Sequence, residues 1–405
     1  MAYHTRIIEK QLTERIKNED KVFVEGSLGT GKSTLLKKVC DKTYDIKKAL
    51  SIPNDAMMLD INPAIVFKGK GIHGVDGFDL DYSVEAHQKG KAVYFSSRAT
   101  GKEHLTLYPL SFYEQGISNG SVSLASLFAG AYEENFKGSA SLSLNDLAAN
   151  LAKGGYPVSL GKKGSTYPKK VIDTLVNGLL SKESKTEQSP KRLSAILRRY
   201  AMAVGTIEKN TDMLRDLRGE DPSLAESTLY DVLSALKRLL ILDEIEAWHP
   251  PIKASATIRR LGKKEFVDPS LALACLGKGE ADLKKDPSLW SRLFEGAAAR
   301  DLKVYSSSLG GKIMHYEDRF GLRADLVLFF KNGKYALIQA RLGEKDAKAG
   351  EKQLLELKKR VLLHDSIHPE AMIGLPSFLL VVTNGEKAYR SGSGVYFCPL
   401  ACLGE

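Results

Sequence analysis

Residues 26–33 read Gly-Ser-Leu-Gly-Thr-Gly-Lys-Ser, which fits the pattern G-x-x-x-x-G-K-[ST] of a phosphate-binding P-loop. An apolar run from Val22 to Val24 comes before this segment, and a helical pattern with Leu35, Leu36 and Val39 on one face comes after it. A P-loop needs this order of strand, loop and helix. The segment therefore predicts an α/β domain of the P-loop NTPase class near the N-terminus.

The residue types of this segment suit a bound nucleotide. Glycines at 26, 29 and 31 let successive N–H groups turn toward phosphates, and the following helix N-terminus adds partial positive charge. Lys32 can reach the β- and γ-phosphates, and the Ser33 hydroxyl can bind Mg²⁺. We therefore predict ATP and Mg²⁺ as cofactors, with these nucleotide-binding residues: Gly26, Ser27, Leu28, Gly29, Thr30, Gly31, Lys32, Ser33 and Thr34.

A hydrolytic site needs more than the P-loop. An ATPase has a strand that ends in Asp, usually followed by Glu, to hold the metal and polarise the attacking water. After a strand-like run at 56–59, residues 72–77 offer Asp76, but Gly77 stands where the Glu is expected. We predict that Asp76 joins Ser33 at the metal, with Asp79, Asp81 and Glu85 as alternatives. The water-polarising residue stays unidentified, so hydrolysis is an open question.

Residues 91–98 form a β-prone run that ends in Ser96, Ser97 and Arg98. In a P-loop domain such a strand lies beside the nucleotide, where Ser97 or Arg98 can sense the γ-phosphate. The alternative is a buried strand with a polar end. The predicted catalytic set is Lys32, Asp76 and Ser97.

With 405 residues the chain is long enough for several domains, and we predict three: 1–135, 136–265 and 266–405. The polar N-terminus has no apolar segment of signal-peptide type, and no apolar run approaches 18 residues. These observations predict a cytoplasmic protein without a membrane partner. The net charge of +10 suits DNA, although a basic surface needs no such partner.

Several motifs together resemble a family of prokaryotic AAA-type ATPases with a C-terminal domain of unknown function. They are the P-loop and the segments HLTLYPLSFYEQG (104–116), NLAKGGYP (150–157), FVDPSLA (266–272) and LFE (293–295). The resemblance implies an AAA-like ATPase domain at the N-terminus. It also implies a hydrophobic strand ending in Asp-Glu, from which this sequence departs. Oligomeric state and protein partners stay open, with a homo-oligomer as one alternative.

The middle region is mostly helical in pattern. An apolar stripe runs through residues 228–240, and a strand-like segment, 241–248, follows it. Helix followed by a β-wing predicts a winged helix, which either enters a DNA groove or only couples the two ends of the protein. Nearby basic side chains favour DNA: Arg198, Arg199, Arg259, Arg260, Lys263 and Lys264.

The region after about residue 268 is predicted to contain a helix, strands at 303–305 and 313–316, a hairpin over 325–341, a second helix and a last strand. This order resembles the restriction-endonuclease-like core. Glu295 and Asp325 match the carboxylates that hold Mg²⁺ in active members, but Gln339 and Arg341 replace the expected Glu-x-Lys. A neutral amide binds hard cations weakly, and Arg stays protonated. We therefore predict a degenerate nuclease site that can hold a phosphate through Arg341.

Three functions follow from these predictions. The first is an ATP-binding AAA-type ATPase, with weak hydrolysis as an open alternative, that couples nucleotide state to a winged helix and a degenerate nuclease-like domain. The second is a DNA-binding protein with a structural or regulatory nucleotide. The third, which the replaced Glu-x-Lys argues against, is a metal-dependent nuclease. A metal site at His364 and His368 is disfavoured because Pro369 directly follows.

Overall fold

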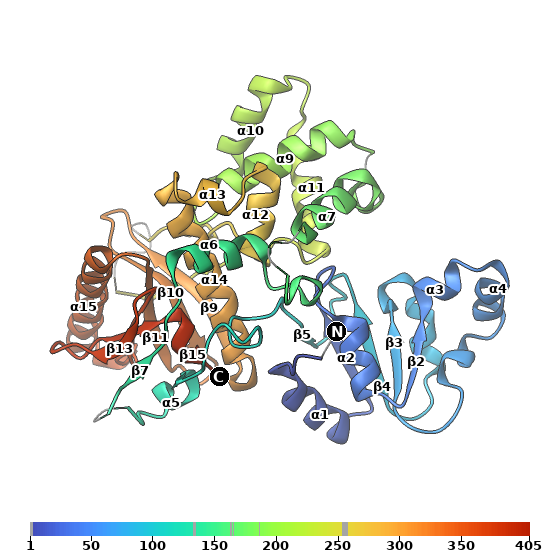
Figure 1. The fold of residues 1–405 in the computed structure, drawn as a ribbon, viewed down its shortest axis with the longest axis horizontal. Coiled ribbons are helices and arrows are strands. Elements are labelled where there is room, and N and C mark those ends of the chain that lie inside the picture. The colour runs from blue at the N-terminus through green and yellow to red at the C-terminus, as the bar shows by residue number, and fades with distance from the viewer. Residues whose placement is uncertain (1–2, 133–134, 163, 165, 186, 253–257) are drawn as a thin grey trace.

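The computed structural model describes residues 3–405 apart from 133–134, 163, 165, 186 and 253–257. Figure 1 shows three units: a parallel sheet with its helices at the N-terminal side, a cap of helices, and a large C-terminal sheet. This arrangement confirms the expected α/β fold with a helical middle region. No described helix is long and apolar enough to cross a bilayer.

The N-terminal sheet has five parallel strands in the order β2-β3-β4-β1-β5. Their bounds are Lys21–Glu25 (β1), Lys42–Asp45 (β2), His73–Asp76 (β3), Ala92–Ser96 (β4) and His104–Thr106 (β5). All five strands point the same way, so their carboxyl ends meet at one edge of the sheet, where ligands bind in open α/β folds.

Both faces of this sheet are covered. Helices α1 (Ile8–Asn18) and α2 (Lys32–Val39) pack on the face that carries Val22 and Val24. The opposite face, which carries Phe23, packs against α3 (Ile46–Leu50), α4 (Pro53–Ile61) and the turn η1 (Pro63–Phe67). Alternate residues of one strand thus serve two cores, as the period of a β-strand requires.

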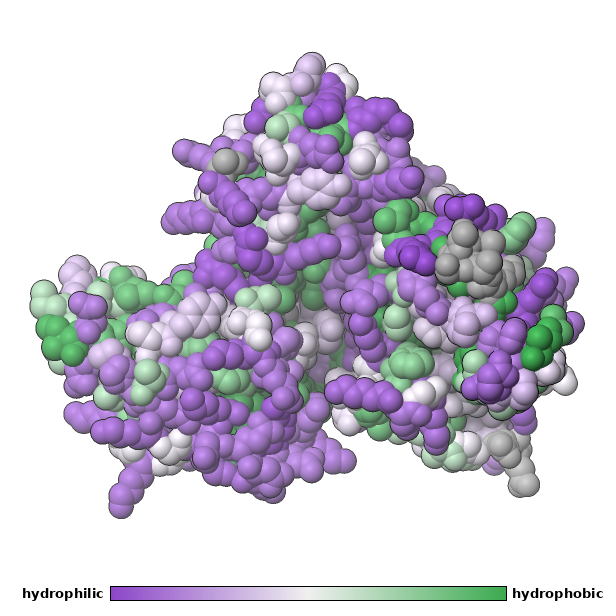
Figure 2. All heavy atoms as spheres, turned by 180° about the vertical axis from the view of Figure 1, so that it is seen from behind, coloured by the Kyte–Doolittle hydropathy of each residue, from purple (hydrophilic) through white to green (hydrophobic). Residues whose placement is uncertain are grey.

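The strand expected at 56–59 is wrong, because α4 occupies these residues. Pro53 lies in the first turn of this helix, and Ala56, Met57 and Leu59 are good helix formers. Only Leu59 of α4 is buried, while Met57, Met58 and Ile61 are exposed. Seen from behind, apolar side chains gather at the outer end of this unit, where α4 lies, and at the opposite end of the molecule near the end of α15 (Glu344–Ile367) (Figure 2).

The helical cap contains α6 to α13. Their bounds are Leu144–Lys153 (α6), Tyr167–Thr174 (α7), Leu180–Glu183 (α8), Pro190–Met202 (α9), Asn210–Glu220 (α10), Glu226–Arg238 (α11), Pro269–Leu276 (α12) and Glu280–Leu283 (α13). The π-helical turn η5 (Leu175–Leu179) joins α7 to α8, and Asn177 and Gly178 leave helical geometry there. The cap shares one hydrophobic core with the C-terminal unit.

Where a winged helix is predicted, the structure contains the expected helix and two isolated β-bridges. Helix α11 covers the expected apolar stripe, and isolated antiparallel bridges join Leu242 to Phe266 and Ile245 to Lys263. The strand β8 (Glu246–Ala247), however, pairs with β9 (Gly311–Glu317) of the C-terminal sheet. The segment after α11 therefore connects two units, and the winged-helix assignment stays a prediction.

The C-terminal sheet has eight strands in the order β7-β13-β14-β12-β11-β10-β9-β8. Its remaining strands are β7 (Gly138–Ser139), β10 (Arg323–Phe330), β11 (Tyr335–Arg341), β12 (Leu379–Thr383), β13 (Lys387–Arg390) and β14 (Tyr396–Pro399). Helix α14 (Pro287–Ser306) shares a core with Leu326 and Leu328, and α15 shares a second core with Val327, on the other face. The strand expected at 303–305 is wrong, because α14 runs through these residues.

Residues on both sides of the expected boundary at 135 belong to this C-terminal unit. Strand β6 (Val122–Ser123) pairs with β15 (Leu403–Gly404), and β7 pairs with β13. On the short helix α5 (Leu124–Phe128), the Phe128 ring lies 4.5 Å from that of Phe330 between centroids. The chain therefore leaves the first unit, adds strands to the third and then builds the second.

Candidate functional site

The P-loop lies between β1 and α2, at the carboxyl edge of the parallel sheet. Gly29 and Gly31 have φ of +83° and +96°, angles that side chains rarely adopt. The Thr30 hydroxyl donates to the Ser27 carbonyl at 3.0 Å, and the Gly26 amide donates to the Ser96 carbonyl of β4 at 3.1 Å. The backbone is thus held as a closed loop over the helix N-terminus.

Lys32 is folded back onto this loop. Its Nζ donates to the carbonyl oxygens of Gly26 and Ser27 at 2.8 and 2.9 Å. Burial lowers the pKa of Lys32 to about 8, although the nearby carboxylates of Asp76 and Asp79 oppose that shift. The ammonium group is therefore short of anionic partners, and a phosphate would supply them.

Asp76 ends β3 and faces the same pocket as the P-loop. Three carboxylates line this pocket. Asp45 accepts from the Lys48 amide and Asp79 is paired with Arg98, whereas the carboxylate of Asp76 has no hydrogen bond to any described residue. Ser33 is exposed in the first turn of α2. A serine hydroxyl and an unpaired carboxylate are oxygen donors that suit Mg²⁺, so the donor set fits the expected ion.

Ser97 and Arg98 follow β4 and also line the pocket. The Ser97 amide donates to Asp79 Oδ1 at 2.9 Å, and Arg98 Nη1 donates to Asp79 Oδ2 at 2.9 Å. Asp79 is thus occupied in holding the end of β4. Asp79, which the sequence offers as an alternative to Asp76, is therefore a poor candidate for the metal and also for the missing water-polarising residue.

The pocket has a volume of about 1340 Å³ and lies between the N-terminal unit and the helical cap. Lys32, Ser33, Thr34, Asp76 and Ser97 line one side of it. The other side comes from the cap and is mostly apolar, although Thr174, Asn177 and Lys182 also line it; its apolar residues are Pro157, Val158, Leu160, Leu175, Leu179, Leu239 and Ile241. The structure therefore brings the residues predicted near the phosphates together and adds a wall that the sequence did not indicate.

Tyr167, the first residue of α7, covers the P-loop. A Cβ built on Gly29 would lie 2.3 Å from the Tyr167 hydroxyl oxygen, and one built on Gly31 would lie 3.2 Å from Pro157 Cγ. The cap therefore touches the P-loop backbone at two glycines. No sequence signal marked Tyr167, because its role depends on how two distant segments pack.

We expect Gly29→Ala to destabilise the protein by about 2–4 kcal/mol in chemical denaturation. A positive φ costs an alanine on the order of 1–3 kcal/mol, and the clash with Tyr167 adds to this. Gly101→Ala is the matched control, since Gly101 has φ of +71° and nothing within 4 Å of the added Cβ. If Tyr167→Ala does not recover part of the loss in Gly29→Ala, the contact is not the cause.

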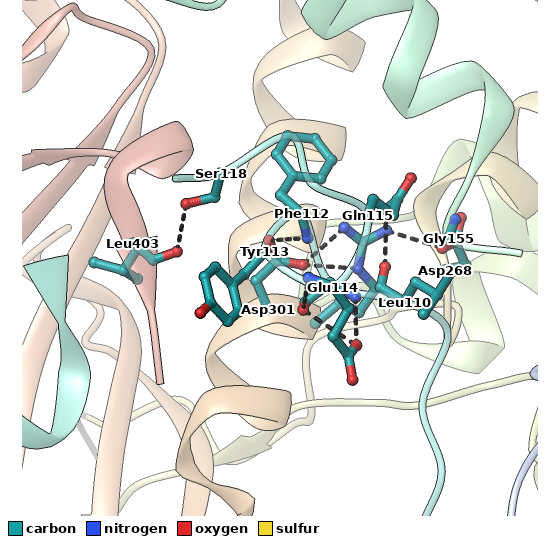
Figure 3. Close-up of polar contacts among 12 residues, drawn as sticks. Leu110, Phe112, Tyr113, Glu114, Gln115, Ser118, Gly155, Asp268, Asp301 and Leu403 are labelled. Atoms are coloured by element: carbon teal, nitrogen blue, oxygen red, sulfur yellow. Dashed lines mark hydrogen bonds and ion pairs between the residues drawn. The ribbon is translucent and has the colours of Figure 1, made fainter. Parts of the chain in front are cut away.

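A buried polar hub ties the P-loop to the rest of the molecule. Arg6 donates through Nη1 to the Thr30 carbonyl at 2.9 Å and through Nε to Glu114 Oε1 at 3.0 Å. Glu114 Oε2 in turn accepts from the Ser111 amide at 2.9 Å. In Figure 3 the loop that carries Phe112 and Glu114 lies against α14, and the Phe112 amide donates to Asp301 Oδ2 at 3.0 Å. Motif residues 104–116 therefore connect the P-loop to α14.

The hub continues into a buried ion triad. Arg300 Nη1 donates to Asp268 Oδ2 at 2.9 Å, and Arg300 Nη2 donates to Asp301 Oδ1 at 2.7 Å. Asp268 also accepts from the Gly155 amide at 2.9 Å, as Figure 3 shows. Burial raises the pKa of Asp301, and the Arg300 guanidinium opposes the rise. Asp268 thus joins the motif segments 150–157 and 266–272, and Arg300 joins Asp268 to α14.

The residues of the predicted nuclease site also come together. Glu295 lies on α14, Asp325 on β10, and Gln339 and Arg341 on β11. Arg341 contacts Asp325 and Gln339 directly, and Gln339 Nε2 donates to the Arg323 carbonyl at 2.6 Å. Arg341 is thus paired inside the chain, and its role in holding a phosphate stays a prediction.

Lys263 supplies a second internal cation to this cluster. Its ammonium group contacts the Glu295 carboxylate and donates to the Asp325 carbonyl at 3.0 Å. Across the described residues, no group of three or more His, Cys, Asp or Glu side chains is arranged to hold a metal ion. Lys263 was expected on a DNA-binding surface, and it instead neutralises a buried carboxylate.

The other basic side chains of the middle region are mostly paired as well. Arg198 contacts Glu220, Arg199 contacts Glu208 and Asp216, and Arg259 contacts Glu317. Lys264 is buried beside Glu244. These ion pairs neutralise much of the positive charge that supported the DNA-binding hypothesis.

The comparisons with known proteins leave the function open. Residues 144–282 match the family model described as "Domain of unknown function (DUF8612)", and this match spans nearly all of α6 to α13. Among solved structures, the Walker-type ATPase PabY2304 of Pyrococcus abyssi is similar to the chain with a TM-score of 0.40 and 14% identity. The similarity covers 66% of this chain and 94% of that one. No curated protein matches the sequence significantly.

Proposed function

We propose that the protein binds ATP with Mg²⁺ in the pocket between the N-terminal unit and the helical cap. The observation that carries this proposal is the pocket itself, because a P-loop, Ser33 and Asp76 lie on one side and an apolar wall lies opposite. Polar groups at one end and apolar side chains at the other are typical of sites that hold a charged ligand with an aromatic base. Bound Mg²⁺ would neutralise phosphate charge between Ser33 and Asp76.

We further propose that hydrolysis is slow. Polarising the attacking water requires a carboxylate near the γ-phosphate. Asp76 is assigned to the metal, Asp79 is paired with Arg98, and Asp45 caps α3. The described residues that line the pocket supply no further carboxylate.

The test is calorimetric titration with ATP, ADP and a non-hydrolysable ATP analogue in Mg²⁺, followed by phosphate release from the same sample. We expect binding of all three nucleotides and release much slower than one turnover per second, the low end for ordinary enzymes. Failure to bind any of them would contradict the proposed site. Rapid release would show that binding is correct and that a water-polarising group has been missed.

We expect nucleotide affinity to fall about tenfold between pH 7 and pH 9. The free protein has a Lys32 pKa of about 8, and a bound phosphate raises it by adding negative charge. Below pH 8 the lysine is already charged, whereas above pH 8 binding must take up a proton and weakens. Titrations at several pH values measure this dependence.

Lys32→Arg is the control for this pH effect, since a guanidinium group stays charged throughout the range. If that variant binds, its affinity is expected to be flat where that of the wild type falls. A wild-type affinity that does not change between pH 7 and pH 9 would contradict the role assigned to Lys32.

A further inference from the structure

Arg98 joins the nucleotide pocket to the helical cap. Its Nη1 lies 2.9 Å from Asp79 Oδ2 in the N-terminal unit, and its Nε lies 2.8 Å from Glu183 Oε2 in the cap. The residue also lines the pocket beside Ser97. A cation in this position is within the same cavity as Lys32, where the phosphates of a nucleotide are proposed to lie.

Glu183 also binds a second arginine, Arg238, which lies in the cap. Its Oε1 accepts from Arg238 Nε at 3.0 Å, and its main-chain carbonyl accepts from Arg238 Nη2 at 2.7 Å. Arg238 ends α11, and its own carbonyl accepts from the Ala99 amide at 2.8 Å. One carboxylate therefore joins the end of β4, the end of α8 and the end of α11.

The segment that carries Glu183 is broken next to the pocket. Asn177 and Gly178 line the cavity, and Gly178 has φ of +149°, which interrupts the helix between α7 and α8. Tyr167 at the start of α7 covers Gly29, while Glu183 at the end of α8 holds Arg98. Both ends of this broken segment thus contact groups that surround the phosphate side of the pocket.

We propose that Glu183 competes with the terminal phosphate of ATP for Arg98, so that ATP, more than ADP, loosens the contact between the N-terminal unit and α8. This inference rests on the proposed function and adds a regulation to the same site. Phosphate oxygens form strong charge-assisted hydrogen bonds with guanidinium groups. When the phosphate displaces Glu183 from Arg98, Glu183 keeps its hydrogen bonds to Arg238. Helices α8 and α11 therefore move together.

The experiment compares the ratio of ATP to ADP affinity in the wild type, Glu183→Gln and Arg98→Gln by calorimetry. Glu183→Gln removes the competitor and is expected to raise the preference for ATP about fivefold. Arg98→Gln removes the phosphate contact and is expected to lower it by a similar factor. If the ion pair were purely structural, both substitutions would change the ratio of ATP to ADP affinity in the same direction. Glu187→Gln is the matched control, because Glu187 is exposed and has no ion pair with any described residue.

Each result decides between specific claims. If the wild type binds neither nucleotide, the proposed function fails, and the inference fails with it. If the wild type binds both and Glu183→Gln behaves like Glu187→Gln, only the inference fails. If Glu183→Gln does not fold, Arg238→Gln replaces it, since Glu183 then holds Arg98 more firmly and the preference for ATP must fall.

Discussion

Lys32→Ala is expected to weaken ATP binding by up to about 100-fold. A hydrogen bond to a charged group contributes up to about 3 kcal/mol, and each 1.4 kcal/mol is a factor of ten in affinity. Lys32 is buried in the loop with its ammonium group against two carbonyl oxygens, whereas Lys47 and Lys182, which also line the pocket, do not belong to the P-loop. Calorimetric titration with ATP in Mg²⁺ measures the loss.

Lys37→Ala is the control for this substitution. Lys37 lies on the same helix, α2, is exposed, and does not line the pocket. Its removal changes the net charge equally and should leave affinity within a factor of two or so, as is usual for surface positions. Equal affinities of Lys32→Ala and Lys37→Ala would contradict the site assignment.

Arg300→Met is expected to have the largest effect on stability. The side chains of Asp268 and Asp301 are 0% exposed, and both depend on this guanidinium. Breaking a buried ion pair by removing one partner costs about 3–5 kcal/mol, and here two carboxylates lose their partner. The midpoint of chemical denaturation should fall accordingly, or the variant should fail to fold.

Two control variants are compared with Arg300→Met. Arg300→Lys keeps the charge but loses the planar array of donors, so an intermediate loss is expected. Arg198→Met removes an arginine whose ion pair with Glu220 is solvent-exposed, and it should cost less than about 1 kcal/mol. Similar losses in Arg300→Met and Arg198→Met would show that the triad contributes no more than a surface pair.

The local features of the site could be predicted from the sequence. The spacing of Gly26, Gly31 and Lys32 fixes the P-loop because each residue type meets a local backbone or charge requirement. The positions of Asp76 and Arg98 could be predicted as strand ends, since parallel strands bring their carboxyl ends to one edge. These inferences need only neighbouring residues and the direction of the strands.

Contacts between distant segments could not be predicted in the same way. Tyr167 on Gly29 and Glu183 on Arg98 depend on how the cap docks, and neither residue belongs to a recognisable pattern. Lys263 was interpreted as a surface cation because sequence alone does not show burial. A strand is predicted at 303–305, since a short segment with Val and Tyr fits either a strand or a helix until its surroundings are known.

The order in which the chain is made matters for the C-terminal unit, which contains the eight-stranded sheet and the two-stranded sheet of β6 and β15. The strands of the N-terminal sheet all lie within the first 106 residues, so that sheet can form early during synthesis. Strands β6 and β7, by contrast, pair with β15 and β13, which are translated more than 240 residues later. Until then their edges stay unpaired, and such edges invite aggregation. The N-terminal sheet can therefore be complete long before the C-terminal unit closes, and a chaperone would be most useful between these two events.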